Sequence, residues 1–438
     1  MKLSKVKSIY NNLPPTIAKP LQYLPFELFL GSVYRKQLEK LHLFHAQKSE
    51  IVERAHRQLL FDYCNWAIDS VPFYRDFSRS SRIGHVSSFE DFYKLPIIDK
   101  EQICEDLRWF SPKDRVKSFS VTTGGTTGKQ TKILMSNEAF RKEWAFVAHF
   151  LYTNGIDINE SRLCFRGVST VANRVVNYNP LYKELQVSPF KICQSNIDEI
   201  MSNVLRFNAT WIHGYPSAIS DFAKLILKNG IDLKFKLVLL VSESCSDDQR
   251  YVISKAFGAK VVTFYGMTER VIFAGGEVGA KLSCNKLYGC TEIVGGELVG
   301  TGFVNKATAL IRYRSGDQAL THCDDIGNVS EISKVIGRWG KEYLIGKSGT
   351  HITMTALNVH DDIFDSVRRY QFRQKRVGEC LIDIEFYSKD YDVSIVPKVV
   401  SLFQSKLGGE IILTPNVVDE ISLTGRGKHK FIINELID

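Results

Sequence analysis

Short β-rich runs alternate with helical stretches from about residue 116 to residue 309, and this alternation limits the fold more than any other feature of the chain. The β-rich runs lie at residues 162–166, 209–213, 236–242 and 260–265. The helical stretches lie at residues 136–153, 197–207, 217–228 and 246–256. Such alternation is typical of an α/β sheet with helices packed on it. The run Val238–Val241 is apolar throughout, which favours a strand covered on both faces.

Helical periodicity marks the first part of the chain, and a shorter segment follows the sheet region. We predict a helix over residues 36–69 that ends before Pro72, a short helix capped at Ser87-Ser88, and another helix after Asp99. Glycines and charges at residues 336–341 indicate a domain boundary. We therefore expect a large domain over residues 1–337, with a helical lead-in at 1–115, and a small domain over 338–438. The small domain is expected to have helices near residues 356–368 and 394–407, and strands near 380–387 and 410–414.

Size and charge narrow the class of protein. A chain of 438 residues with 44% hydrophobic content is typical of a soluble globular protein with two or three domains. The net charge of +9 favours anionic ligands such as nucleotides. Lys and Arg are spread along the chain without a basic stripe, so we expect no nucleic-acid partner.

Cysteine usage and hydropathy bear on location. The nine cysteines are irregularly spaced, which suits a reduced, cytoplasmic interior better than a disulfide framework or a zinc site. No run reaches the ~18 apolar residues of a membrane span. The apolar and aromatic segment Leu21–Tyr34 could rest on a membrane, but packing on its own domain is the favoured interpretation.

A threonine- and glycine-rich stretch follows the run 116–121 and predicts a phosphate-binding loop. Residues 122–129 contain four threonines, three glycines and one lysine. Glycine allows close backbone approach, bare N–H groups can point at phosphate oxygens, and the lysine adds positive charge. It is not a Walker loop, because Thr123 stands where the first glycine belongs and Gln130 follows the Gly-Lys pair. Alone, the stretch could equally be a surface turn.

Further motifs recur in order, several of them at the ends of predicted strands. Ligands of open α/β sheets bind beyond the carboxyl ends of the strands, so these motifs are candidates for one site. Individually each is more often a turn, a solvated cap or a basic tail. The motifs are His213–Ser217, Ser242–Ser244, Tyr265–Glu269, Tyr313–Asp317, Gly337-Arg338, Gly349–Ile352 and Gly425–Lys428.

Together these motifs resemble those of the adenylate-forming superfamily of acyl-CoA synthetases. The chain is most similar to the phenylacetate–CoA ligase-like branch, and within it to the group found with capsule and other surface-polysaccharide biosynthesis genes. His56–Leu60, Ser70–Tyr74 and Leu95–Ile97 look like the lead-in of that branch. The resemblance covers essentially the whole chain. It implies an α/β fold, with a large N-terminal adenylate-forming domain of layered β-sheets and helices and a small mobile α+β lid domain.

The resemblance also implies ATP-dependent activation of a carboxylic acid to an acyl-adenylate, followed by acyl transfer to coenzyme A or to an amine. The resemblance implies that Tyr265 stacks on adenine and that the adjacent Gly266 also belongs to the nucleotide site. Ser242 and Glu243 would line the base pocket, and Asp317 would bind the ribose hydroxyls. Thr268 contacts the α-phosphate, Glu269 binds Mg²⁺ and Arg338 lies near the ribose and phosphates. Loop 123–131 holds the β- and γ-phosphates of ATP. The nucleotide-binding residues in this loop and directly before it are Thr122, Thr123, Gly124, Gly125, Thr126, Thr127, Gly128 and Lys129.

The lid is expected to supply Lys428, whose charge would neutralise the attacking carboxylate and the α-phosphate together. Residues 337–341 would form the hinge. Here the chain departs from the family, which usually has one residue and then two acidic residues after Gly-Arg. This chain has Trp339-Gly340-Lys341-Glu342 instead, so Lys341 is only a weak candidate for the pivot. Gln130 and Lys430 are milder departures from the commoner Pro and Arg.

The acyl pocket is the least defined part of the prediction. By analogy, helix 139–152 and residues 215–219 would line it, and for each candidate core packing is an equally good interpretation. The candidates are Phe146, His149, Phe150, His213, Gly214 and Tyr215. The acceptor could be coenzyme A or an amine on an amino sugar or amino acid. The alternative function is a catalytically inactive nucleotide-binding module, which the retained Glu269, Asp317, Arg338 and Lys428 argue against.

Overall fold

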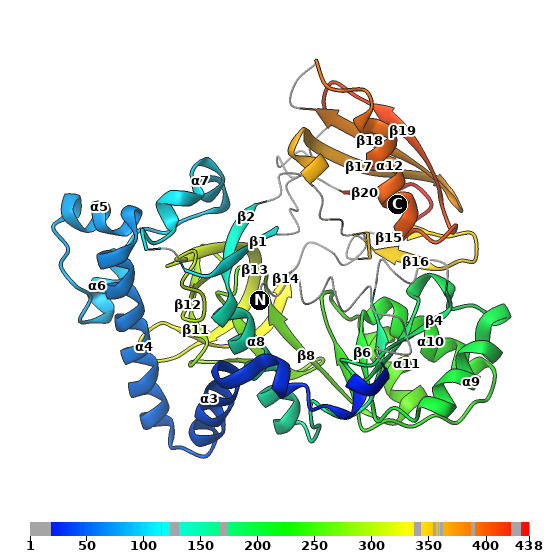
Figure 1. The fold of residues 1–438 in the computed structure, drawn as a ribbon, viewed down its shortest axis with the longest axis horizontal. Coiled ribbons are helices and arrows are strands. Elements are labelled where there is room, and N and C mark those ends of the chain that lie inside the picture. The colour runs from blue at the N-terminus through cyan, green and yellow to red at the C-terminus, as the bar shows by residue number, and fades with distance from the viewer. Residues whose placement is uncertain are drawn as a thin grey trace. The chain divides into compact units, whose positions relative to one another are not determined.

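The computed structural model describes residues 19–114, 116–122, 131–166, 174–336, 343–353, 356–357, 359, 362–386, 390–421 and 431–437 (Figure 1). The chain divides into two compact units. Unit 1 comprises Met1–Thr123, Thr131–Asn159 and Thr263–Gly337, and unit 2 comprises Gly124–Gln130, Glu160–Val262 and Arg338–Asp438. The predicted domain boundary falls on residues 337 and 338, which lie outside the described residues, and stays a prediction. No helix within the described ranges is long and apolar enough to cross a membrane.

Unit 1 begins with a series of helices whose ends follow local chemistry. Val71 is extended (φ −107°, ψ 124°) because Pro72 follows it and opens the next helix. The side chain of Ser88 accepts a hydrogen bond from the N–H of Asp91, which confirms the predicted cap. Asp99 forms a capping box with Gln102 at the start of the helix predicted to follow it. The helices are η1 (Lys19–Tyr23), α3 (Glu27–His45), α4 (Ser49–Ser70), α5 (Pro72–Ser81), α6 (Phe89–Lys94), α7 (Lys100–Glu105), η2 (Leu107–Phe110) and α8 (Asn137–Thr153).

The prediction of one continuous helix over 36–69 is wrong, because the chain leaves helical geometry between α3 and α4. Lys48 is extended (φ −63°, ψ 148°), and residues 45–50 are all exposed. No large apolar side chain occurs between Phe44 and Ile51 to hold this stretch on the core. The helical period continues on both sides of the break, which explains why the periodicity alone did not reveal it.

The strands of unit 1 are antiparallel, and the lead-in helices share a core with them. The order is β11-β12-β13-β14-β10-β9, with β1 and β2 forming a separate hairpin. Tyr74 ties α5 to this region, because its hydroxyl donates to the carbonyl of Ala309 (3.2 Å) and accepts from the N–H of Ile311 (3.0 Å). The strands are β1 (Ser118–Thr122), β2 (Lys132–Ser136), β9 (Phe273–Glu277), β10 (Leu282–Cys284), β11 (Gly289–Val294), β12 (Glu297–Gly302), β13 (Tyr313–Cys323) and β14 (Val329–Ile336). The strand β8 (Lys260–Gly266) runs across the division between the units.

Unit 2 contains the predicted parallel sheet. Its strands have the order β7-β6-β3-β5-β4, parallel except for the antiparallel edge strand β4. All four residues of β7 are buried, as expected for a strand covered on both faces. The elements of this part are β3 (Arg162–Phe165), β4 (Val176–Asn179), β5 (Glu184–Val187), η3 (Pro189–Lys191), η4 (Gln194–Asn196), α9 (Ile197–Phe207), β6 (Trp211–Gly214), α10 (Pro216–Lys228), β7 (Leu237–Leu240) and α11 (Asp247–Phe257) (Figure 1). These bounds confirm the predicted strand–helix alternation.

The C-terminal segment of unit 2 builds a four-stranded sheet covered by one helix. The antiparallel pair β17–β18 lies between the parallel edge strands β19 and β20. Phe403 of the helix packs on Tyr370 and Phe372, with ring centroids 5.1 Å from each. The elements are β15 (Tyr343–Ile345), β16 (His351–Thr353), η5 (Asp362–Asp365), β17 (Val367–Arg376), β18 (Glu379–Phe386), α12 (Ile395–Lys406), β19 (Ile412–Val417) and β20 (Ile432–Asn434).

Two outcomes follow for this segment. The predicted helix near 394–407 and the strands near 380–387 and 410–414 are confirmed. The predicted helix near 356–368 is wrong, because the described part of this stretch holds only the short η5 before β17 begins at Val367.

Candidate active site

Two of the predicted nucleotide-binding residues of unit 1 contact each other. Tyr265 lies near the end of β8, and its hydroxyl donates a 2.8 Å hydrogen bond to Oδ2 of Asp317 on β13. Burial raises the pKa of Tyr265 well above its usual range, and the charge of Asp317 adds to this, so the phenol stays protonated. The neighbouring Gly316 has φ 77°, and its N–H donates to Glu297 (2.7 Å), so a glycine is required to turn the strand here.

Glu269 lies beside the same strand. The hydroxyl of Tyr313, the first residue of β13, donates to Oε1 of Glu269 (3.2 Å). Burial raises the pKa of Glu269, the nearby charge of Asp317 raises it further, and Tyr313 and Lys100 oppose this. A half-buried carboxylate near a second one is a fitting ligand for a divalent cation, since the cation would relieve both burial and repulsion.

The donor set around Glu269 fits Mg²⁺ in one particular way. The described residues contain no group of three or more His, Cys, Asp or Glu side chains able to hold a metal by themselves. Mg²⁺ is commonly bound through one or two carboxylates together with phosphate oxygens and waters. A site built on Glu269 would therefore need the phosphates of a nucleotide to complete it.

An ion pair that the sequence patterns did not reveal holds the turn after Glu269. Arg270 has a left-handed backbone (φ 61°), and its guanidinium pairs with the carboxylate of Glu143 on α8. Tyr288 donates to the second oxygen of Glu143 (2.6 Å), so both carboxylate oxygens are used. Glu143 is almost fully buried. The one local signal that could have indicated this ion pair is the charged Arg270 directly after the sequence Tyr-Gly-Met-Thr-Glu.

The remaining described candidates of unit 1 lie at or just after the ends of their strands. Thr122 ends β1 and pairs with Lys132, so the residues that flank loop 123–131 are partners in one hairpin. Gly266 ends β8, and Thr268 lies in the turn closed by the hydrogen bond from the N–H of Arg270 to the carbonyl of Met267 (3.1 Å).

Several predicted residues lie outside the described residues, and their roles stay predictions. They are Thr123, Gly124, Gly125, Thr126, Thr127, Gly128, Lys129, Arg338 and Lys428, together with hinge residues 337–341.

In unit 2 the predicted base-pocket residues follow β7. Ser242 has φ 68°, a strained conformation for a residue other than glycine. The carboxylate of Glu243 accepts from the N–H of Ser217 at the start of α10 (3.3 Å) and from the hydroxyl of Thr353 in β16. Burial raises the pKa of Glu243, with both hydrogen bonds opposing the shift. Glu243 thus links the loop after β7 to both neighbouring elements.

The acyl-pocket candidates of unit 2 lie at the end of β6. Nδ1 of His213 is buried without a hydrogen-bond partner, and burial, helped by the charges of Arg166 and Arg162, lowers the pKa of His213 well below its usual range. The imidazole is therefore neutral. Gly214 cannot carry a side chain, because a Cβ would lie 2.3 Å from the carbonyl oxygen of Phe165. Tyr215 is buried and begins the turn into α10.

The candidates on α8 have different surroundings. Phe146 is 1% exposed and packs edge-on against Tyr288 at 4.9 Å, which places it in the core of unit 1. The ring of His149 lies 5.3 Å from each of His42 and His45 on α3. Burial and these two rings lower the pKa of His149 to about 4. Phe150 packs closely on Gly275, where a Cβ would be 2.5 Å from the ring.

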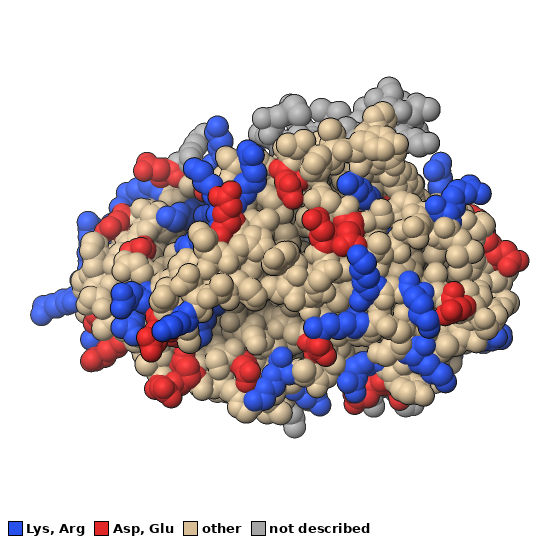
Figure 2. Space-filling model, turned by 90° about the horizontal axis from the view of Figure 1, so that it is seen from below, with Lys and Arg blue, Asp and Glu red and all other residues tan. Residues whose placement is uncertain are grey.

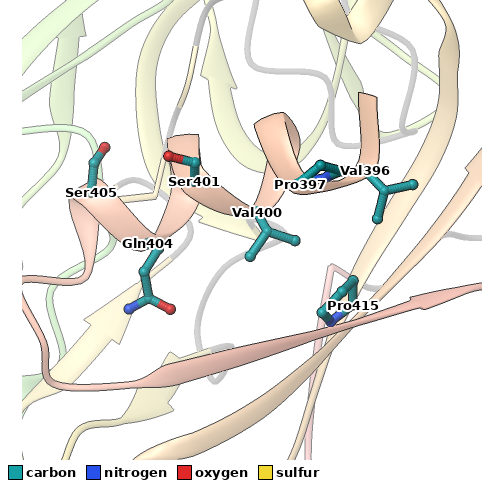
Figure 3. Close-up of a pocket in the computed structure, with 7 residues that line it drawn as sticks. All are labelled: Val396, Pro397, Val400, Ser401, Gln404, Ser405 and Pro415. Atoms are coloured by element: carbon teal, nitrogen blue, oxygen red, sulfur yellow. The ribbon is translucent and has the colours of Figure 1, made fainter. Parts of the chain in front are cut away.

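A separate apolar groove occurs in the C-terminal segment. It has a volume of about 590 Å³ and is lined by α12 and β19 (Figure 3). None of the predicted site residues that the structure describes lines it. The lining side chains are Val396, Pro397, Val400, Ser401, Gln404, Ser405 and Pro415.

Solved structures of adenylate-forming ligases share this fold. A crystal structure of 2-hydroxyisobutyryl-CoA ligase with 2-HIB-AMP and CoA, in the thioesterification state, matches with a TM-score of 0.56 and 18% identity, over 89% of this chain and 90% of that chain. The same ligase in the postadenylation state with R3-HIB-AMP matches with a TM-score of 0.52 and 16% identity, over 87% and 89% of the two chains. The expected class, a large α/β domain with a smaller C-terminal domain, is confirmed.

Sequence comparison narrows the class. A family model described as the CapK C-terminal domain matches residues 344–435. The chain is also 22% identical to Protein CapK of Staphylococcus aureus over 450 residues, covering 98% of this chain and 99% of that protein. The resemblance to adenylate-forming enzymes and to the capsule-type group is therefore confirmed, and residues 344–435 are similar to the CapK C-terminal domain.

Proposed function

We propose that this protein is an ATP-dependent ligase that activates a carboxylic acid as an acyl-adenylate and releases pyrophosphate. The observation that carries the proposal is the grouping in unit 1 of three residues from two separate motifs. Tyr265 bonds to Asp317, and Glu269 accepts from Tyr313, the residue that opens the Asp317 motif. A Mg²⁺-bound nucleotide requires an aromatic ring for its base, a carboxylate for its ribose hydroxyls and a carboxylate for its metal ion, and Tyr265, Asp317 and Glu269 would supply these groups.

Each residue would contribute by binding and orienting rather than by covalent chemistry. Tyr265 would stack on adenine, and Asp317 would accept hydrogen bonds from both ribose hydroxyls. Glu269 would hold Mg²⁺, whose charge would offset that of the phosphates. Thr268 would contact the α-phosphate, and the loop 122–129 would bind the β- and γ-phosphates. Glu243 and Ser242 would line the base pocket. Charge stabilisation of this kind is the main source of catalysis in phosphoryl-type displacements.

The second half-reaction would pass the acyl group to an acceptor. Coenzyme A and an amine of an amino sugar or amino acid are the two candidates. The 2-hydroxyisobutyryl-CoA ligase structure in the thioesterification state contains CoA, which favours a thiol, whereas the likeness to Protein CapK favours a step in capsule or O-antigen synthesis, where acyl groups occur as amides. The proposal also includes that the enzyme is of the phenylacetate–CoA ligase-like type, that its C-terminal domain is a mobile lid and that the protein is cytoplasmic.

Charge distribution argues against a nucleic-acid ligand. On the face shown in Figure 2, Lys and Arg are interspersed with Asp and Glu, without a continuous basic stripe. Among the described residues, some cations are paired, as in Lys236 with Glu160 (2.8 Å) and Lys281 with Glu331 (3.1 Å). A small anionic ligand such as ATP suits this surface better than a polynucleotide backbone.

Acid-dependent exchange of labelled pyrophosphate into ATP tests the proposal. A panel of aliphatic, hydroxy and aromatic carboxylic acids should contain at least one acid that starts the exchange in the presence of Mg²⁺. Glu269→Gln and Asp317→Asn should each abolish most of it. The inactive nucleotide-binding module would be favoured instead if the protein binds nucleotide but no acid starts the exchange, and if neither change affects this binding.

A further inference from the structure

The first described segment of unit 1 buries one side and exposes another that is unusually apolar. Phe26, Leu30 and Tyr34 are 6%, 3% and 0% exposed, and the ring of Phe26 packs edge-on against Trp144 of α8 at 5.0 Å. This confirms the favoured expectation that the segment packs on its own domain. The opposite residues remain in solvent. We call the exposed set the N-terminal apolar surface; its members are Tyr23 (80%), Leu24 (40%), Leu28 (62%), Phe29 (37%) and Leu43 (68%).

Isolated exposed apolar residues are ordinary, but this concentration is not. Four of the five members fall within the seven residues 23–29, where η1 ends and α3 begins. Gly31 then bends α3, with φ 71° and ψ −163°. Pro25 is also exposed, so the turn from η1 into α3 presents mostly apolar atoms. Removal of such a surface from water lowers the free energy of the system.

Charge in the same part of the chain indicates what covers this surface. Residues 1–48 contain eight Lys and Arg against two Glu, which is six of the nine net positive charges of the whole chain. Among the described residues of α3, Arg35 and Lys36 are both exposed, and they follow Leu28 and Phe29 beyond the bend at Gly31. Exposed aromatic and leucine side chains beside cations are the pattern of segments that lie in the interface of an anionic membrane.

We propose that the N-terminal apolar surface binds peripherally to an anionic lipid bilayer. Tyr23 and Leu28 would enter the boundary between headgroups and acyl chains, and Arg35 and Lys36 would contact lipid phosphates. The contact is interfacial, since no helix among the described residues is able to span a bilayer. A second copy of the chain is a less fitting occupant, because two such surfaces would bring their excess of positive charge together. This inference stands apart from the proposed ligase activity.

Co-sedimentation of the full chain with vesicles tests the inference. Phosphatidylcholine vesicles with and without phosphatidylglycerol are compared at low and high salt. The variants are the pair Tyr23→Ser and Leu28→Ser, and the pair Arg35→Gln and Lys36→Gln. The matched control is the pair Tyr251→Ser and Leu205→Ser, because these residues are each 64% exposed on α11 and α9. All replaced side chains are at the surface, so folding should be retained, and circular dichroism checks this.

The expected result is binding that requires phosphatidylglycerol and weakens with salt. The Tyr23 and Leu28 pair should lower partitioning by roughly tenfold, and the cationic pair by roughly fivefold for each charge removed. The control pair should bind like the wild type. Absence of binding to anionic vesicles, or an equal loss in the control pair, would overturn the inference. So would a concentration-dependent dimer in light scattering that the Tyr23 and Leu28 changes dissolve, because the surface would then be an interface between copies.

Discussion

The hydroxyl of Tyr265 donates a 2.8 Å hydrogen bond to Asp317, a residue that we assign to the ribose of ATP. The bond joins the end of β8 to β13 within unit 1 and fixes the edge of the tyrosine ring. It leaves one carboxylate oxygen of Asp317 outside this contact. The pair therefore orients both the ring that would stack on adenine and the carboxylate that would bind ribose, before any nucleotide arrives.

Replacement of Tyr265 by Phe tests the value of this orientation. The ring is kept, but the bond to Asp317 is lost, which costs about 1.5 kcal/mol for a hydrogen bond to a charged group. We expect the KM for ATP to rise roughly tenfold, with a smaller change in the KM for the acid. Tyr251→Phe, on the exposed face of α11, is the matched control. If Tyr265→Phe leaves the KM for ATP unchanged, the bond does not position the nucleotide site.

The buried pair of Arg270 and Glu143 should support the turn that carries Glu269. Glu143→Gln removes the charge and leaves the Arg270 guanidinium buried without its counter-ion, which should cost ~3 kcal/mol of stability. Adenylation should fall with it, mainly as a raised requirement for Mg²⁺. Glu331→Gln, in the exposed pair with Lys281, should cost less than about 0.5 kcal/mol. Equal effects of the two changes in chemical denaturation would contradict the account.

Burial of His149 predicts that acid destabilises unit 1. The folded state lowers the pKa of His149 to about 4 from its ordinary value of 6.5, so the unfolded chain takes up the proton first as pH falls. The stability due to the neutral ring is present above pH 6.5 and is lost progressively toward pH 4.

We expect His149→Gln to reduce this acid-induced loss by about 1 kcal/mol, a value that allows for partial solvent exposure of the site. The measurement is the free energy of unfolding at pH 7 and at pH 4.5. His42 and His45 face the same ring and are kept unchanged. A variant whose pH dependence matches that of the wild type would show that His149 contributes nothing to it.

The strand–helix alternation of unit 2 could be predicted from the sequence because each element carried its own signal. The strands β3, β6 and β7 are short runs rich in apolar residues, and α9–α11 have helical spacing, with a capping box at Ser246 before α11. The strands β9–β14 carried weaker signals. β9 contains Gly275 and Gly276, β10 pairs with β14, which is distant in the sequence, and β12 pairs with β13 in a bulged register. A single sequence does not show such partners.

The residues of the candidate site also differ in whether the sequence alone could identify them. Tyr265 and Glu269 stand near or just after the end of β8 and Asp317 lies within β13, all in recognisable motifs, so they could be named from the sequence. Glu143 could not, because it is 127 residues from Arg270 and sits in a helix whose pattern only indicates a buried face. Its role depends on the packing of α8 against the rest of unit 1, which no local pattern encodes.

Lys428 gives a prediction that depends on the sequence alone. Lys428→Ala should lower adenylation by ~10²–10³ because the charge on the attacking carboxylate and the α-phosphate would no longer be neutralised. Transfer from a supplied acyl-adenylate should be largely spared. Lys430→Ala, two residues further along the same segment, is the control and should retain adenylation. Equal loss of both half-reactions in Lys428→Ala would exclude this role.

Oxygen tracing tests the central claim most directly. The protein is incubated with ATP, Mg²⁺, the acceptor and an activating acid whose carboxylate is labelled with ¹⁸O, and the products are analysed by mass spectrometry. Attack of the carboxylate on the α-phosphate followed by acyl transfer predicts AMP that carries one ¹⁸O atom and pyrophosphate that carries none. Label in inorganic phosphate together with ADP, or unlabelled AMP, would contradict the formation of an acyl-adenylate.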